Sequence, residues 1–262
     1  MRKLREIREL AGRKLLRFEP LFWAQLAARA QAVRPGKRPN MQRVNVALQS
    51  KEDWQQARRE VIELGLKPHV DPPKSWDALI ALDLILRELQ SPESAILDAG
   101  AAPYSPLLSY LYWYGYRDLH GINLIFEGPF NYGPIRYIQG DITRLPYENN
   151  RFDAITSLSV IEHGVDVPAF LREAHRTLRP NGLLVVSCDY HADKTPTEGM
   201  TAYGGPVRVF DRAEMEEILA VAKGLGLTPT SPVALDCTAR PVHWERLNID
   251  FTFLCLAFRK AL

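Results

Sequence analysis

Short apolar runs alternate with amphipathic stretches along the C-terminal two thirds of the chain. The apolar runs predict seven strands, at Ala95–Asp98, Leu119–Asn123, Ile135–Gln139, Phe152–Leu158, Gly182–Ser187, Thr228–Leu235 and Phe251–Phe258. The amphipathic stretches predict helices between several of these strands, at Pro106–Tyr114, Val167–Leu178 and Arg212–Lys223. Such alternation is typical of a doubly wound α/β fold, in which helices cover both faces of a mostly parallel sheet.

The N-terminal part of the chain has a helical pattern instead. Apolar residues in 2–31 recur mostly every three or four positions, which predicts one or two amphipathic helices broken near Pro20. Ser50 and Gly65 have the features of the start and end of another helix, and Ser75 caps the helix that leads into the first strand. We therefore expect an N-terminal helical cap and substrate region at 1–74, followed by the α/β domain at 75–262.

Charge is distributed unevenly between these two parts. Residues 1–43 contain 12 Lys or Arg and 3 Asp or Glu, whereas the whole chain has a formal charge of only +2. An amphipathic helix of this kind ordinarily packs on the main domain. The alternative partner of residues 1–43 is a membrane surface, bound peripherally, or a polyanion.

The composition is that of an ordinary globular protein, with 46% hydrophobic and 24% charged residues. Cys188, Cys237 and Cys255 are too far apart to indicate a disulfide framework or a zinc site. The charged start “MRKLREIREL” interrupts any apolar segment of signal-peptide or membrane-spanning length. We expect a cytoplasmic protein with no exported or spanning segment.

The stretch “SAILDAGAAPYSPLLSYL” (94–111) places an acid and few glycines at the end of the first predicted strand. A dinucleotide site would need Gly-x-Gly-x-x-Gly there, so that backbone amides approach a pyrophosphate, and this loop has Gly100 alone. Asp98 would repel a pyrophosphate and suit an ammonium group. The helix start at Ser105 and Pro106 offers free amides to a carboxylate. S-adenosylmethionine has both of these groups and no phosphate.

Three segments of the chain resemble the class I S-adenosylmethionine-dependent methyltransferases in their order and spacing. They are “AILDAGAA”, “GDITRLPYENNRFDAITSLSVIEHG” and “FLREAHRTLRPNGLLVVSCDY”. The resemblance covers roughly residues 76–260 and includes “FTFLCLAFRK”, which is similar to the antiparallel last strand of the family. It implies a seven-stranded sheet, and S-adenosylmethionine as the cofactor.

The resemblance also implies which residues surround that cofactor. Those expected are Asp98, Gly100 and Ala101 at the methionine end, Asp141 and Ile142 at the adenine, and Ser159 beneath the cofactor. The alternative for Asp141 is a residue that only caps a turn, and for Gly100 a tight turn without a ligand. Asp141 and Asp189 without a third ligand are poor evidence for Mg²⁺, so we expect no metal.

The chain departs from the family after the second predicted strand. Asn123, followed by Leu124, occupies the position where the family commonly has an acid for the ribose hydroxyls. A neutral amide hydrogen bonds more weakly than a carboxylate, so Glu127 is an alternative ribose ligand. “LIFEGPFNYGP” (124–134) contains too many Gly and Pro for the usual helix. Aromatic residues of this segment, or the N-terminal cap, are expected to cover the adenine.

Five histidine and aromatic positions are candidates for the acceptor side. His163, just beyond the fourth predicted strand in “SVIEHG”, is the candidate general base because imidazole titrates near neutral pH. Its alternative role is to shape the loop together with Glu162. The candidate substrate residues are Trp76, Tyr190, His191 and His243. Trp76 is equally compatible with a position in the core.

The sequence therefore predicts a methyltransferase that moves a methyl group to oxygen or nitrogen of a small molecule, such as a sugar, a lipid-linked compound or a secondary metabolite. One alternative is an RNA methyltransferase that uses the basic segment 1–43, although the absence of a nucleic-acid module disfavours it. Another is a noncatalytic cofactor-binding protein. “YHADK” (190–194) fits the Tyr-x-x-x-Lys of nicotinamide dehydrogenases but is predicted as a loop. The oligomeric state is left open.

Overall fold

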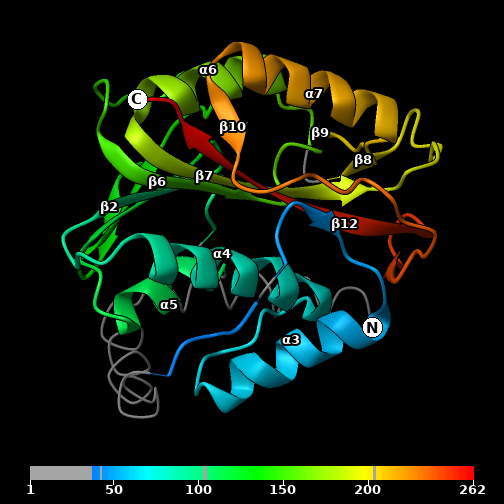
Figure 1. Cartoon of the computed structure of the whole chain (residues 1–262), viewed down its shortest axis with the longest axis horizontal. Helices are drawn as coiled ribbons and strands as arrows, with labels where there is room; N and C mark the ends of the chain where they lie inside the picture. Colours follow the sequence, from blue (N-terminus) through cyan, green and yellow to red (C-terminus); the bar gives the residue numbers. More distant parts are fainter. Residues whose placement is uncertain (1–36, 42, 103–104, 203–204) are drawn as a thin grey trace.

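A mixed sheet forms the centre of the described residues, which are 37–262 except 42, 103–104 and 203–204 (Figure 1). In this computed structural model the sheet has ten strands: β1 Val46–Ala47, β2 Ala95–Ala99, β3 Asp118–Asn123, β4 Phe130–Tyr132, β5 Ile135–Gln139, β6 Phe152–Leu158, β7 Leu178–Tyr190, β10 Leu227–Pro229, β11 Val242–Trp244 and β12 Ile249–Lys260. Their order is β1-β12-β7-β6-β2-β3-β5-β4, and β10 and β11 also pair with β12. The basic helices predicted within 2–31 lie outside the described residues.

The pairing confirms the α/β fold expected from the sequence. Strands β5, β3, β2, β6 and β7 are parallel neighbours, and β12 is antiparallel to β7. The described residues contain ten strands in this sheet where the apolar runs predicted seven. The additional strands β1, β4 and β11 have two or three residues each, which is too short for a periodic pattern.

Helices cover both faces of the sheet (Figure 1). On one face lie α4 (Ser75–Glu88) and α5 (Leu107–Trp113), and on the other lie α6 (Val167–Thr177) and α7 (Arg212–Gly224). Strand β12 serves both layers, because Phe253 and Cys255 pack with α4 whereas Leu254 and Leu256 pack with α6 and α7. Successive side chains of a strand point to opposite faces of the sheet, so a strand that is buried on both faces contributes to both layers.

Helix α3 (Lys51–Glu63) forms a third layer beneath α4 (Figure 1). Ser50 caps it by accepting a hydrogen bond from the Asp53 amide, as the sequence predicts. Ala57 and Val61 are buried, and they join the hydrophobic cluster that contains α4. Helix α4 is consequently enclosed between α3 and the sheet, and nearly all of its residues are buried. Residues 37–74 thus share a core with the domain that follows them.

The connection from β3 to β5 contains a short strand, β4, which is antiparallel to β5. Phe130 stacks on Tyr137, with ring centroids 4.9 Å apart, and Phe126 meets both rings edge to face. A further pair of strands, β8 (Thr201–Ala202) and β9 (Gly205–Pro206), follows β7. Among the described residues, no helix has both the length and the apolar character that a bilayer crossing requires.

Candidate active site

The loop after β2 passes close to the loop after β6 and depends on a glycine. Gly100 has a φ of +93°, and its amide donates to the carbonyl oxygen of Ile122, 2.8 Å away. A Cβ atom at this position would lie 2.4 Å from Cγ2 of Val160. Both the backbone conformation and the close approach therefore require glycine. Ala101, the next residue, is buried.

Asp98 lies near the end of β2 with only 4% of its surface exposed. Its Oδ1 accepts a hydrogen bond of 2.8 Å from the Thr156 hydroxyl. Burial raises the pKa of Asp98 to about 6, although the Thr156 hydrogen bond lowers it. The charged neighbour that acts on it is another carboxylate, Asp77, which raises this pKa further. Such a site favours a ligand that brings a positive charge.

Asn123, at the end of β3, holds the same loop from the other side. Its amide nitrogen donates to the carbonyl oxygens of Gly100 at 3.0 Å and Ala101 at 2.9 Å, and its Oδ1 accepts from the Ile125 amide. A carboxylate would place negative charge against two carbonyl oxygens. An amide therefore fits this position, where the sequence resemblance leads to the expectation of an acid. Leu124 is 65% exposed.

Asp141 follows β5, at the same edge of the sheet as Asn123. Its Oδ1 accepts hydrogen bonds of 2.8 Å from both the amide and the hydroxyl of Thr143, and it is exposed. The Gly140 amide donates to the Asn123 carbonyl oxygen at 3.1 Å and so joins the two strand ends. Ile142 is buried in the core beneath them. Asp141 therefore caps the turn, which is its alternative role in the sequence analysis. It also lies at the sheet edge where the adenine is expected.

Asp77 connects α4 to the ends of β6 and β7, a role that the sequence analysis did not identify. Its Oδ2 accepts from the Ser187 hydroxyl at 2.6 Å and from the Ser159 hydroxyl at 3.4 Å. The Ser159 amide donates to both the carbonyl and the hydroxyl oxygen of Ser187, each at 3.0 Å. Ser159 has a φ of +53°, which places its amide and hydroxyl in this arrangement.

Lys74 meets two further buried carboxyl groups at the same edge. Its ammonium lies 5.0 Å from the centre of the Phe253 ring, and Phe253 is paired across the strands with Asp189. The carboxylates of Asp189, Glu162 and Asp77 raise the pKa of Lys74 although burial opposes this. Burial also raises the pKa of Glu162 and of Asp189, and their mutual repulsion raises that of Glu162 further. The pair therefore retains a proton beside a charged lysine.

His163 lies in the loop between β6 and α6, and its ring meets Trp244 edge to face at 6.5 Å. Burial lowers the pKa of His163 to about 4, and the charge of Lys74 contributes to this. The ring is thus neutral at pH 7 but binds a proton weakly. The basicity of His163 is thus lower than an unperturbed imidazole provides, and its predicted position at the acceptor side stays a prediction.

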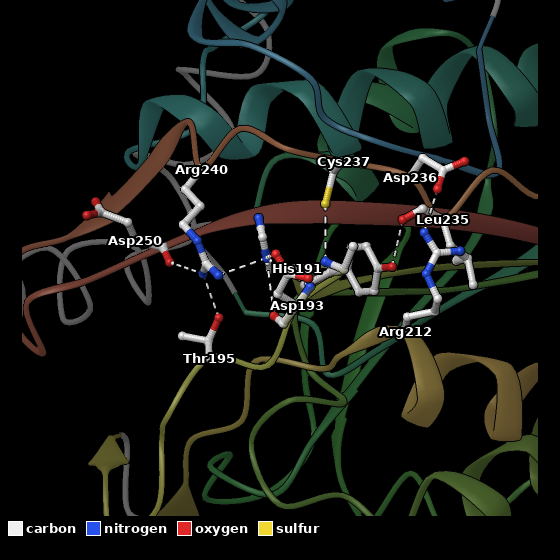
Figure 2. A network of polar contacts seen from close by, with 11 residues as sticks. His191, Asp193, Thr195, Arg212, Leu235, Asp236, Cys237, Arg240 and Asp250 are labelled. Carbon is white, nitrogen blue, oxygen red and sulfur yellow. Dashed lines mark hydrogen bonds and ion pairs between the residues drawn. The ribbon is translucent and has the colours of Figure 1, made fainter.

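The four candidate substrate residues separate into different environments. Trp76 is buried in the core around α4. Tyr190 is fully buried and donates to the Leu235 carbonyl oxygen in the layer of α6 and α7. His243 on β11 is half-exposed and contacts the Asp250 carboxylate at 2.8 Å. His191, in contrast, is only 3% exposed and lies at the end of β7 in a polar network (Figure 2).

In the part of the chain that the structure describes, no group of three or more His, Cys, Asp or Glu is arranged to hold a metal.

Comparison with known proteins gives matches to methyltransferases. Residues 123–186 match the family described as “Methyltransferase domain”. A demethylmenaquinone methyltransferase of Mycolicibacterium gilvum is 36% identical over 98 residues, which are 37% of this chain and 39% of that protein. A ubiquinone biosynthesis O-methyltransferase of Azorhizobium caulinodans is 42% identical over 53 residues, 20% of this chain and 21% of that protein. The match with the first of these relatives thus spans about two fifths of its length.

A solved structure extends the similarity over most of the fold. The S-adenosylmethionine-dependent methyltransferase from Mesorhizobium loti superimposes with a TM-score of 0.50 at 19% identity, covering 71% of this chain and 98% of that one. At this level of identity the likeness concerns the fold.

Proposed function

We propose that this chain is an S-adenosylmethionine-dependent methyltransferase that transfers a methyl group to a small molecule, because residues 123–186 match the methyltransferase domain family and the fold resembles that of a solved S-adenosylmethionine-dependent methyltransferase. When bound, S-adenosylmethionine supplies a methyl group on a positively charged sulfur. The protein has to hold that group, align the acceptor with it and take up the acceptor's proton. Alignment alone contributes about 7 to 11 kcal/mol to such a reaction.

One observation carries this proposal, namely the excess of buried carboxyl groups at the carboxyl edge of the sheet. The carboxyl groups there are Asp77, Asp98, Glu162 and Asp189, and the lysine among them is Lys74. A cationic, phosphate-free ligand compensates this charge, whereas a pyrophosphate increases the repulsion. Asp98, with Asp77 behind it, is the proposed partner of the methionine ammonium group.

The remaining contacts to the cofactor follow the strand order. We assign the backbone of Gly100 and Ala101 to the methionine end, since a glycine at this turn leaves the approach free of side-chain atoms. The edge formed by Leu124, Asp141 and Ile142 is the proposed adenine side. Asn123 supports the loop from beneath in place of binding the ribose through a charge. Ser159, tied to Ser187, forms the floor.

The proposed acceptor is a lipid-linked aromatic compound, one of the classes that the sequence predicts. The relatives named above are a demethylmenaquinone methyltransferase and a ubiquinone biosynthesis O-methyltransferase. The segment 123–186, which matches the methyltransferase domain family, includes His163. His163, Trp244 and Lys74 form the wall on that side. The proposed cap, residues 1–74, would complete it, and its described part already covers α4.

Two measurements test the proposal. Isothermal titration calorimetry should show that the full-length protein binds S-adenosylmethionine and S-adenosylhomocysteine. Incubation with deuterated-methyl S-adenosylmethionine and a panel of phenolic and quinol acceptors should then yield labelled products in mass spectrometry. Cofactor binding without transfer to any acceptor would favour the noncatalytic alternative, and salt-sensitive RNA binding with labelled RNA would favour the RNA methyltransferase.

A further inference from the structure

Three buried polar side chains, in the loop after β6 and at the end of β7, have atoms without a hydrogen-bond partner among the described residues. They are both carboxyl oxygens of Glu162, Oδ1 of Asp189 and Nε2 of His191. Glu162 is 0% exposed, Asp189 4% and His191 3%. Glu162 and Asp189 hydrogen bond to each other when they share a proton, which pairs one oxygen of each. The second oxygen of Glu162 and Nε2 of His191 stay unpaired. Folded proteins pair nearly all buried polar atoms, so these remaining atoms indicate a ligand.

The three side chains converge on the α4 side of the sheet. The backbone remains extended through His191, because the His191 amide donates to the Phe210 carbonyl oxygen and the Phe210 amide donates to that of Asp189. Alternation therefore places Asp189 and His191 on the face of Ser187, which contacts Asp77 of α4. Glu162 reaches the same space, since it and Asp189 both act on Lys74 and hydrogen bond to each other when one is protonated.

Arg240 contacts the His191 ring and determines which of its nitrogens accepts a hydrogen bond and which donates one (Figure 2). Its guanidinium lies 2.8 Å from Nδ1 of His191, and it also donates to the Thr195 hydroxyl at 2.6 Å and the Asp250 carbonyl oxygen at 2.9 Å. A guanidinium can only donate, so Nδ1 of His191 accepts. The Asp193 amide donates to the same nitrogen at 3.1 Å. The ring proton accordingly resides on Nε2, the atom that has no partner among the described residues.

We propose that Glu162, Asp189 and His191 form a subsite for a hydroxyl group of the acceptor, with Arg240 as the positioning residue. The hydroxyl donates its hydrogen to the Asp189–Glu162 carboxyl pair and accepts a hydrogen bond from Nε2 of His191. This inference rests on the proposed methyltransferase function and specifies its substrate as a phenol or an alcohol.

The arrangement distinguishes an oxygen acceptor from a nitrogen one. A hydroxyl oxygen has two lone pairs, so one can accept the hydrogen bond from His191 while the other forms the bond to the methyl carbon. An amine nitrogen has one lone pair, and the same hydrogen bond would occupy it. As the oxygen–carbon bond forms, the hydroxyl proton passes to the carboxyl pair, whose negative charge is thereby neutralised. The methyl donor loses its positive charge in the same event, so charge balances.

Binding measurements test the subsite independently of turnover. With S-adenosylhomocysteine present, catechol should bind the wild-type protein, and 1,2-dimethoxybenzene, which lacks the hydroxyl hydrogens, should bind at least about tenfold more weakly. Asp189→Asn and His191→Phe should each weaken catechol binding about 10- to 100-fold. The affinity of His191→Phe for S-adenosylhomocysteine should change less than about twofold. Asp53→Asn on α3 and His175→Phe on α6 are the controls and should bind catechol as the wild type does.

The role of Arg240 has a spectroscopic readout. In ¹⁵N-histidine-labelled protein, the His191 ring should show a proton on Nε2 and an unprotonated Nδ1 in the wild type and in Arg240→Lys, and a mixture of tautomers in Arg240→Met. Unchanged catechol affinity in both Asp189→Asn and His191→Phe, equal binding of the dimethyl ether, or no catechol binding to the wild type would overturn the subsite. Failure of the wild type to bind S-adenosylhomocysteine would instead refute the proposed function, which separates the two ideas.

Discussion

Asn123 donates a hydrogen bond of 3.0 Å to the carbonyl oxygen of Gly100, and thereby joins the end of β3 to the loop after β2. The methyltransferases that the sequence resembles commonly have an acid at this position, so we propose that the amide here supports the loop in place of binding the ribose. Cofactor affinity in this chain should therefore depend on Asn123 through the backbone that it holds.

Asn123→Asp should lower both stability and cofactor affinity. The carboxylate would face the carbonyl oxygens of Gly100 and Ala101 and would lose both hydrogen bonds. We expect the free energy of unfolding to fall by about 1 to 3 kcal/mol in urea titrations, and the calorimetric affinity for S-adenosylhomocysteine to fall at least about tenfold. Asn131→Asp, an exposed residue of β4, is the matched control. If Asn123→Asp bound the cofactor more tightly, the side chain would be a direct ribose ligand.

Gly100→Ala should destabilise the protein more than Gly115→Ala. Both glycines have a positive φ, +93° and +105°, but a Cβ at Gly115 would meet nothing within 4 Å, whereas at Gly100 it would lie 2.4 Å from Val160. The difference in unfolding free energy between the two variants isolates the close contact, and we expect about 1 to 3 kcal/mol. Combination of Gly100→Ala with Val160→Ala should recover part of that difference. Equal effects of the two single variants would show that only the backbone conformation matters.

The sequence predicts the strands and helices of residues 95–260 well where an apolar run is long enough to show its period. It predicts too long a strand at Thr228–Leu235, because β10 includes only Leu227–Pro229 and the prolines at 229 and 232 cannot donate to a neighbouring strand. Asp98 and Gly100 could be identified because strand, acid and glycine are adjacent in the chain.

The polar contacts across the site could not be predicted in the same way. Asp77 and Ser187 are 110 residues apart, and His191 and Arg240 are 49 apart. Each pair exists because α4 and the segment before β11 cross the ends of the central strands, which no local pattern specifies. Lys74 stands in “DPPK”, where the prolines form a short 3₁₀ turn, and only the fold brings its ammonium above Phe253.

Asp98→Asn should stabilise the cofactor-free protein at pH 8 and abolish cofactor binding. The pKa of Asp98 is raised from 3.8 to about 6 by burial, so its ionisation opposes folding. That cost is absent below pH 3.8, grows as the pH rises towards 6 and is complete above it. A shift of this size corresponds to about 2 to 3 kcal/mol. Asn retains an oxygen for the Thr156 hydrogen bond.

Thermal denaturation of both proteins between pH 4 and pH 8 checks this. The melting temperatures should coincide near pH 4 and diverge in favour of Asp98→Asn above pH 6. Thr156→Val, which removes the hydrogen bond but keeps the carboxyl group, should not stabilise the protein at any pH. A lower melting temperature for Asp98→Asn at pH 8 would mean that the carboxylate is paired with a cation in the free protein.

His163→Ala should retain cofactor affinity and reduce turnover. His163 lies beside Trp244, on the proposed acceptor side of the site.

The pH dependence of kcat should not come from His163. Since burial and the charge of Lys74 lower the pKa of His163 to about 4, its titration should leave no inflection in kcat between pH 6 and pH 8. The raised pKa of the Glu162–Asp189 pair, about 7 for Asp189, predicts instead that kcat increases with pH in the neutral range, because the neutral pair loses one of its two protons and gains the negative charge that accepts the acceptor's proton. The profile should be the same in His163→Ala, at a lower plateau. Loss of the pH dependence in His163→Ala would assign the base to the imidazole, and loss in Asp189→Asn would assign it to the carboxyl pair.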